Sequence, residues 1–418
     1  MKKDILKKLE TICVYRNVIN SKIIAKLIIL LNNIENNHDI INSYNDFVVE
    51  VYELDCSIKE AIIDEILLCN NAMTNMISKH KVNEHIREAI KNELEVLHNI
   101  MNITSEDLKD LMSEKIDAST LMGFDNTFIS DNETNDYERL KSKISAFKLN
   151  NYGLVDDIIH FHEKHGVGRS VKYSAFVWQR YDDEDNGKLV EIMHPDPIRL
   201  DDLIGYEHQK KELLLNTKNF VNGKPANNVL LYGSRGTGKS SSVKAILNEF
   251  KDQGLRLIEV DKTQLADFTR IITLLRDKKQ KFIIFVDDLV FDEKESGYSA
   301  LKTILEGRIE KASNNILIYA TTNRRHLVVE KFSDKDEINE KDTIEEKLSL
   351  SDRFGLTISY LSCSQKEYFD IVLGLAQQAN MDIDKNYLQQ EARKWALWHN
   401  GMSPRSAKQF ITHILGEK

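Results

Sequence analysis

Hydrophobic residues recur every three or four positions along the first third of the chain, and this spacing predicts one amphipathic helix after another. The pattern is clearest in AKLIILLNNI, IKEAIIDEILLCNNAM and HIREAIKNELEVLHNIM. None of these stretches contains a recognisable catalytic or ligand-binding motif. Residues 1–148 are therefore expected to form a mainly helical N-terminal domain, either a plain helical bundle or a module that binds a partner.

The pattern changes near residue 150. In residues 149–200, the apolar-rich segments KYSAFVWQR and KLVEIMHP flank the turn DDEDNG and predict a β-hairpin followed by a linker. In residues 201–358, the short apolar runs NNVLLYG, RLIEVD, KFIIFVDD and NILIYATTN alternate with helical patterns, which predicts a parallel sheet with crossover helices. Residues 359–418 return to amphipathic helices, so we expect an α/β domain followed by a helical one.

Composition and charge narrow the class of protein. The chain has 418 residues, of which 41% are hydrophobic and 29% charged, as in an ordinary globular protein of two or three domains. Its net charge of −9 argues against binding nucleic acid over the whole surface, whereas a local basic groove stays compatible. The most apolar early run, KIIAKLIILLNNIENN, is too short to span a bilayer and contains Lys26. We therefore expect a soluble, cytoplasmic protein without membrane insertion.

The segment GSRGTGKS matches the phosphate-binding pattern G-x-x-x-x-G-K-[ST] and lies between an apolar strand and a helical pattern. Its glycines allow backbone N–H groups to face phosphate oxygens, and the following helix N-terminus favours an anion. Lys239 is expected to neutralise the β- and γ-phosphates of ATP, and the Ser240 hydroxyl to bind Mg²⁺. The nucleotide-binding residues expected here are Gly233, Ser234, Arg235, Gly236, Thr237, Gly238, Lys239, Ser240 and Ser241.

Two acids end the apolar run KFIIFVDD. Asp287 is expected to hold Mg²⁺ directly or through water, and Asp288 to polarise the water that attacks the γ-phosphate. Many related ATPases have Glu in the position of Asp288, which is one methylene shorter, so the reach of Asp288 and a simple loop-capping role both stay open. Glu293 and Glu295 are the fallback bases.

Three polar residues farther along the chain are expected to face the γ-phosphate. Asn323 ends the strand pattern NILIYATTN, Arg353 lies in SLSDRFGL, and Arg405 follows Pro404 at the start of a helix. An amide at a strand tip can hydrogen-bond phosphate or water, and a guanidinium can stabilise transition-state charge in its own site or a neighbour's. Each arginine alone is compatible with a surface ion pair, and only their order along the chain favours the functional interpretation.

In this order, the P-loop, FVDD, the strand-ending Asn, DRFGL and a helical segment with Arg405 resemble the AAA+ ATPases. The segments PANNVLLYGSRGTGKSS, VDDL, YATTNRRHL, EEKLSLSDRFGL and SPRSAKQF closely resemble an uncharacterised bacterial family, domain of unknown function 815, over residues 150–418. The family often has Ser-Gly-Arg before the last helix, where this chain has Ser-Pro-Arg, and proline is favourable at a helix start.

The resemblance implies an α/β P-loop NTPase core of the AAA+ type at residues 201–358, with a C-terminal helical lid at 359–418. It also implies that DDLIGYEHQKKELLLNT lies near the adenine. The residue roles that it implies are adenine contacts for Leu203, Ile204 and Gly205, metal binding and catalysis for the Asp287–Asp288 pair, sensor 1 for Asn323, an arginine finger for Arg353 and sensor 2 for Arg405.

Together these features predict an ATPase that uses ATP and Mg²⁺, forms a homo-oligomer through its nucleotide sites, and remodels or loads an unknown protein or nucleic-acid target. The alternative is an ATP-dependent assembly switch with little hydrolysis, which the short Asp288 keeps open. A third interpretation, a monomeric P-loop kinase, is less favoured because it assigns no role to the DRFGL segment or to the lid. No glycine lies between Leu257 and Asp287, so the aromatic–hydrophobic–Gly loop of polymer-threading relatives is absent and threading is disfavoured.

Overall fold

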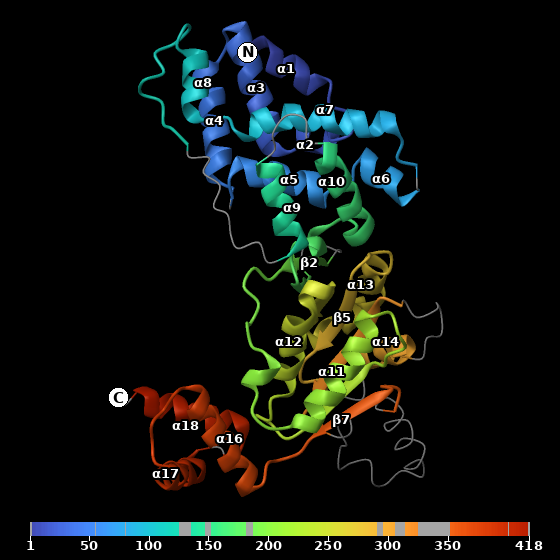
Figure 1. The fold of residues 1–418 in the computed structure, drawn as a ribbon, viewed down its shortest axis with the longest axis vertical. Coiled ribbons are helices and arrows are strands. Elements are labelled where there is room, and N and C mark those ends of the chain that lie inside the picture. Colours follow the sequence, from blue (N-terminus) through green and yellow to red (C-terminus); the bar gives the residue numbers. More distant parts are fainter. Residues whose placement is uncertain are drawn as a thin grey trace. The chain divides into compact units, whose positions relative to one another are not determined.

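The computed structural model of the chain divides into two compact units, Met1–Lys172 and Tyr173–Lys418 (Figure 1). No helix within the described residues is both long and apolar enough to cross a membrane. The structure describes residues 2–54, 56–79, 81–124, 135–146, 152–180, 187–290, 296–305, 314–324, 352–399 and 401–416.

The first unit contains helices and no strand within its described residues, which agrees with the predicted helical N-terminal region. Ser57 and Thr104 begin two of these helices with capping boxes, in which each hydroxyl accepts a hydrogen bond from a backbone N–H one turn later. The apolar faces pack into one continuous core. The helices are α1 (Lys2–Glu10), α2 (Arg16–Ile19), α3 (Lys22–Asn36), α4 (Ile40–Tyr52), α5 (Ile58–Leu68), α6 (Ala72–Ser78), α7 (Glu84–Met101), α8 (Ser105–Met112), α9 (Asp136–Ser145), α10 (Tyr152–His165) and the 3₁₀ turn η1 (Arg169–Val171).

Helix α10 lies in a segment that the sequence pattern groups with the β-hairpin. Its apolar residues Leu154, Ile158 and Phe161 are buried in the same core as α1 to α9. The helix contacts α6, α7 and α9. Residues 152–172 therefore pack with the helical unit, and the chain enters the second unit only at Tyr173.

The second unit is built on a seven-stranded sheet of order β2-β1-β4-β5-β6-β3-β7. Every neighbouring pair is parallel except β1–β2, which forms the predicted antiparallel hairpin. The P-loop strand β3 and the acid-bearing strand β5 lie on either side of β6, the order of the AAA+ P-loop NTPases, so the predicted fold class is confirmed. The strands are β1 (Ala175–Gln179), β2 (Lys188–Glu191), β3 (Val229–Gly233), β4 (Leu255–Glu259), β5 (Lys281–Val286), β6 (Ile316–Thr322) and β7 (Leu356–Tyr360).

Helices cover both faces of this sheet. Neighbouring strand residues alternate between the faces, so that Leu230 packs with Phe268 and Leu301 on one side, and Leu231 packs with Leu213 and Val243 on the other. A sheet that is buried on both faces needs continuous apolar strands, and this explains the run KFIIFV. The covering segments are η2 (Leu200–Asp202), α11 (Glu207–Val221), α12 (Lys239–Phe250), η4 (Lys262–Asp267), α13 (Phe268–Leu275) and α14 (Ser296–Leu305). The 3₁₀ turn η3 (Lys251–Gln253) connects α12 to β4.

The C-terminal helices form the predicted lid, with a separate apolar core around Tyr368, Leu388 and Phe410. Ile204, from the segment before α11, packs against this core. A side chain at Gly374 would lie 2.9 Å from Ile204, so the linker sits directly against the first lid helix. The lid helices are α16 (Gln365–Gln378), α17 (Lys385–Trp398) and α18 (Pro404–Gly416).

Candidate nucleotide-binding site

The loop between β3 and α12 needs glycine for steric reasons. At Gly233, φ is 138°, and a Cβ atom would lie 2.0 Å from the carbonyl oxygen of Tyr360. Gly236 and Gly238 also have positive φ, at 73° and 92°. Helix α12 begins at Lys239, immediately after the last glycine. The loop therefore leads directly into a helix N-terminus, where the first backbone N–H groups favour an anion.

Lys239 is held at the base of this loop. Its Nζ donates hydrogen bonds to the carbonyl oxygens of Gly233 at 3.0 Å and Ser234 at 2.8 Å, and to Oδ1 of Asn323 at 3.0 Å. Burial lowers the pKa of Lys239 below its usual range, and the carboxylates of Asp287 and Asp288 offset part of this effect. The ammonium group is thus positioned between the loop and the carboxyl ends of β5 and β6.

Asp287 and Ser240 form the oxygen-rich part of the site. The Ser240 hydroxyl donates to Oδ1 of Asp287 at 2.6 Å. The Thr321 hydroxyl, from β6, donates to the same oxygen. A carboxylate and a hydroxyl are hard oxygen ligands of the kind that Mg²⁺ prefers, so these residues fit the predicted metal site.

Asp288 has an unusual backbone conformation, with φ of 50°. Asp tolerates this left-handed region better than most residues. The conformation is held by Thr321, whose Oγ1 accepts from the backbone N–H of Asp288 at 3.0 Å. Asn323 donates from Nδ2 to Oδ1 of Asp288 at 2.7 Å, while its Oδ1 accepts from Lys239. Asn323 therefore connects the P-loop lysine to the second acid.

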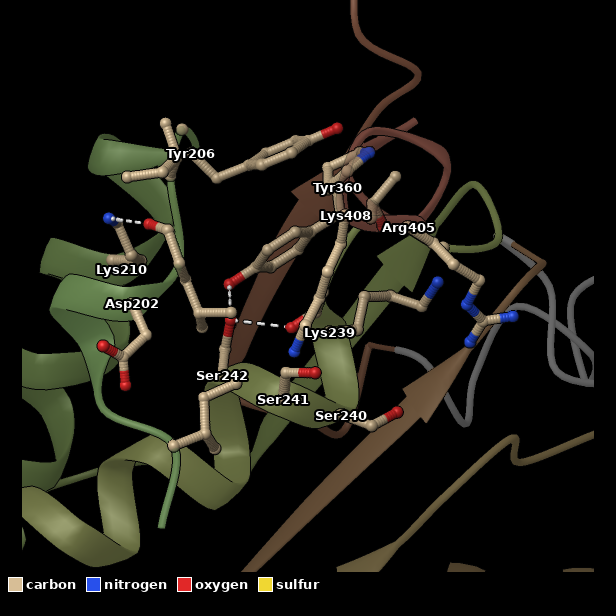
Figure 2. Close-up of a pocket in the computed structure, with 18 of the residues that line it drawn as sticks. Asp202, Tyr206, Lys210, Lys239, Ser240, Ser241, Ser242, Tyr360, Arg405 and Lys408 are labelled. Carbon is tan, nitrogen blue, oxygen red and sulfur yellow. Dashed lines mark hydrogen bonds between the residues drawn. The ribbon is translucent and has the colours of Figure 1, made fainter. Parts of the chain in front are cut away.

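These groups open into one cavity of about 850 Å³. Figure 2 shows its lining from the P-loop, α12, the linker and the lid. Of the predicted site residues, the cavity brings together Leu203, Ile204, Gly205, Arg235, Gly236, Thr237, Gly238, Lys239, Ser240, Ser241, Asp287, Asp288, Asn323 and Arg405.

The remaining predicted residues lie elsewhere. Gly233 and Ser234 form the base of the loop, where the N–H of Ser234 donates to the carbonyl of Tyr360 at 3.0 Å. Arg353 is half-buried before β7 and is not among the residues that line the cavity. The fallback bases Glu293 and Glu295 lie outside the described residues.

Two tyrosines that the sequence pattern did not single out close one end of the cavity. The rings of Tyr206 and Tyr360 stack with centroids 5.1 Å apart. The Tyr206 hydroxyl donates to the carbonyl of Leu361 at 2.6 Å, and the Tyr360 hydroxyl donates to Oγ of Ser242 at 3.0 Å. Burial raises the pKa of Tyr360 to about 12, so its hydroxyl stays protonated as a donor. The pair ties the linker and β7 to the first turn of α12.

The lid contacts the P-loop through its last helix, α18. The backbone N–H of Arg405 donates to the carbonyl of Gly236 at 3.0 Å. A Cβ at Gly236 would lie 3.0 Å from Cβ of Arg405 and 3.3 Å from Oγ of Ser403. The lid is therefore seated directly on the loop, and the exposed side chains of Arg405 and Lys408 line the cavity.

Two curated relatives match parts of the chain. Replication factor C large subunit of Ignicoccus hospitalis is 30% identical over 131 residues, which cover 30% of this chain and 27% of that protein. Proteasome-activating nucleotidase 2 of Haloferax volcanii is 26% identical over 176 residues, which cover 36% of this chain and 43% of that protein. The chain thus spans less than half the length of either relative.

Solved structures with a similar arrangement include the RuvB Holliday junction branch migration motor of Thermotoga maritima. It has a TM-score of 0.38 and 20% identity over 53% of this chain and 65% of its own. The replication initiator DnaA bound to AMPPCP and single-stranded DNA has a TM-score of 0.38 and 17% identity over 54% of this chain and 66% of its own.

A family model matches residues 171–418, which include the whole sheet, the cavity and the lid. Its description is "Protein of unknown function (DUF815)". Because the match covers more than half of the 418 residues, the chain belongs to this family.

Proposed function

We propose that this protein binds ATP with Mg²⁺ and hydrolyses it to ADP and phosphate. The observation that carries the proposal is the hydrogen-bonded series from Lys239 through Asn323 to Asp288, beside the Ser240–Asp287 pair in the same cavity. A lysine for phosphate, hard oxygen ligands for Mg²⁺ and a carboxylate for water are the groups that phosphoryl transfer to water requires.

Each group has a distinct role in this proposal. The N–H groups of the loop and Lys239 hold the β- and γ-phosphates. Ser240 and Asp287 hold Mg²⁺, which neutralises charge on the phosphate oxygens when it is bound. Asp288 orients the attacking water and accepts its proton, and Asn323 positions the Asp288 carboxylate.

The opposite end of the cavity suits the base. Leu203, Ile204 and Gly205 line it beside the stacked pair of Tyr206 and Tyr360. Apolar side chains and exposed backbone are the surroundings that favour a planar purine. We assign the adenine to this end.

We further propose that copies of the chain assemble through their nucleotide sites. Arg353 does not line the cavity of its own chain, which supports a role in the site of a neighbouring copy. Its guanidinium would there stabilise charge on the γ-phosphate, while Arg405 couples the lid to the same phosphate. The target is a protein or a nucleic acid, which the helical first unit selects. The two curated relatives are a replication factor and a proteasome-activating nucleotidase, so they do not favour either kind of target.

One observation favours an assembly switch with little hydrolysis as the alternative. The short Asp288 side chain is already engaged by Asn323, which limits its freedom to reach a water molecule. Such a switch would bind ATP and assemble without turnover.

The test is the steady-state ATPase rate per protomer over a wide range of protein concentration, with Lys239→Ala as the blank. We expect the rate per protomer to rise with concentration and to fall roughly 10³-fold in Arg353→Ala without loss of ATP binding. Arg276→Ala, which removes an exposed surface arginine, is the matched control. Mixing Lys239→Ala with Arg353→Ala should restore activity, because mixed assemblies pair an intact site with an intact arginine. An ATPase rate that stays at the level of the blank at all concentrations, while ATP is bound, favours the assembly switch. An inactive mixture of the two variants shows that Arg353 does not act in the site of a neighbouring copy.

A further inference from the structure

Lys408 is a second cation on the lid that the proposed roles do not use. It follows Arg405 by three residues in α18, so both side chains lie on the same face of the helix. Both are exposed and line the cavity. Among the described residues, the ammonium group of Lys408 has no hydrogen-bond or ion-pair partner, whereas that of Lys210 in the same cavity donates to the carbonyl of Leu203 and pairs with Glu207.

The position of Lys408 over the site is set by the seating of the lid. The Arg405 N–H bonds to the carbonyl of Gly236, and the lid core packs against Ile204 of the linker. These contacts hold the start of α18 against the P-loop and the core of the lid against the linker. Figure 2 shows the Lys408 side chain extending from the lid into the cavity, in the direction of the first turn of α12.

In the proposed mode of nucleotide binding, the phosphate nearest the sugar would lie at that first turn. Lys239 points toward Asn323 and the two acids, which marks the γ-phosphate end of the cavity. The stacked tyrosines mark the base end, and Tyr360 is bonded to Ser242 in the first turn of α12. Ser241 and Ser242 therefore lie between the two ends, at the helix terminus that favours an anion.

We propose that Lys408 binds the α-phosphate of the nucleotide, opposite the first turn of α12. This inference rests on the proposed binding of ATP. ATP and ADP share the α-phosphate, so Lys408 should stabilise both nucleotides equally. A residue that contacts the γ-phosphate stabilises ATP alone, as expected for Arg405.

The experiment measures the dissociation constants of ADP and of a non-hydrolysable ATP analogue, both with Mg²⁺, for the full chain and its variants. Lys408→Met keeps the aliphatic stem and removes the charge, and Lys408→Arg keeps the charge. Lys366→Met, at an exposed lysine of α16 that does not line the cavity, is the matched control. Because Lys408 is exposed, we expect the variants to fold, and equal thermal unfolding midpoints verify this.

We expect Lys408→Met to weaken the binding of both nucleotides by the same factor, about tenfold, since it removes one charge-assisted contact to phosphate. Lys408→Arg should restore most of the affinity, and Lys366→Met should change neither constant. Loss of affinity for the ATP analogue alone would place Lys408 at the γ-phosphate and overturn the assignment. If Lys408→Met binds both nucleotides with unchanged affinity while Lys239→Ala abolishes binding, Lys408 does not bind the α-phosphate, and the proposed function is unaffected. Failure of the unaltered chain to bind either nucleotide would reject both.

Discussion

Replacing Asp288 by Asn separates the proposed chemistry of this residue from its structural role. Asp288 has a φ of 50°, a conformation that Asn adopts at least as readily as Asp. The amide oxygen of Asn can still accept the hydrogen bond from Asn323, and the backbone bond to Thr321 is unchanged. Asp288→Ala is a poorer probe, because a residue with Cβ and no polar side chain costs about 1–2 kcal/mol in this conformation.

The expected decrease in the rate of ATP hydrolysis follows from the loss of the Asp288 carboxylate. An amide cannot accept a proton from water at neutral pH, and the contribution of a positioned general base is roughly 10²–10⁴ in rate. This factor corresponds to about 2.7–5.5 kcal/mol of activation free energy. Nucleotide affinity should change little, because the backbone of the site, Lys239 and the Ser240–Asp287 pair remain in place.

The assay is single-turnover hydrolysis at saturating protein, with ATP affinity measured separately. Asp277→Asn removes the same charge from a side chain that is 92% exposed, and it controls for the change in net charge. We expect Asp277→Asn to hydrolyse ATP at the unaltered rate. If Asp288→Asn also stays within about threefold of that rate, the general-base role of Asp288 is refuted.

Two further predictions concern folding. Gly233→Ala should abolish nucleotide binding and lower the unfolding midpoint by several degrees, since its Cβ would lie 2.0 Å from the carbonyl of Tyr360. Gly254→Ala, with φ of 89° and no atom within 4 Å, should show only the smaller cost of backbone strain in the same melting assay. Burial lowers the pKa of His162 from 6.5 to about 4, so the unfolded chain binds the proton first as pH falls. The stability of the first unit should therefore decrease below about pH 6.5, by up to about 1.4 kcal/mol per pH unit, and His162→Gln should reduce this slope in urea titrations.

The contiguous parts of the site were predictable because their chemistry is carried by adjacent residues. The P-loop from Gly233 to Ser240 is a strand end, a glycine-rich turn and a helix start in a row. Asp287, Asp288 and Asn323 each follow an apolar strand, and parallel strands bring such ends to one edge of the sheet. The structure accordingly places Asn323 within hydrogen-bonding distance of Asp288.

The parts formed by tertiary packing were not predictable. Thr321 is a β-branched residue inside a strand, and nothing local distinguishes the hydroxyl that binds Asp287 from any other strand threonine. Tyr206 and Tyr360 meet only because α11 and β7 pack together. Lys408 is one of 57 lysines and arginines in the chain. In the fold, the hairpin was predicted, but the pairing of its first strand with β4 depends on contacts more than 70 residues away in sequence, such as Ala175 with Leu257.

The hydrogen bond from the Arg405 N–H to the Gly236 carbonyl joins an amide of the lid to an acceptor of the loop. Such an amide exchanges its hydrogen for deuterium only when the bond breaks. Its exchange rate therefore reports how often the lid lifts from the loop. The N–H of Ala407, two residues later, is bonded to Ser403 within the lid and reports fraying of the helix instead. Comparing the deuterium uptake of these two backbone amides therefore distinguishes lifting of the lid from local unfolding of its last helix.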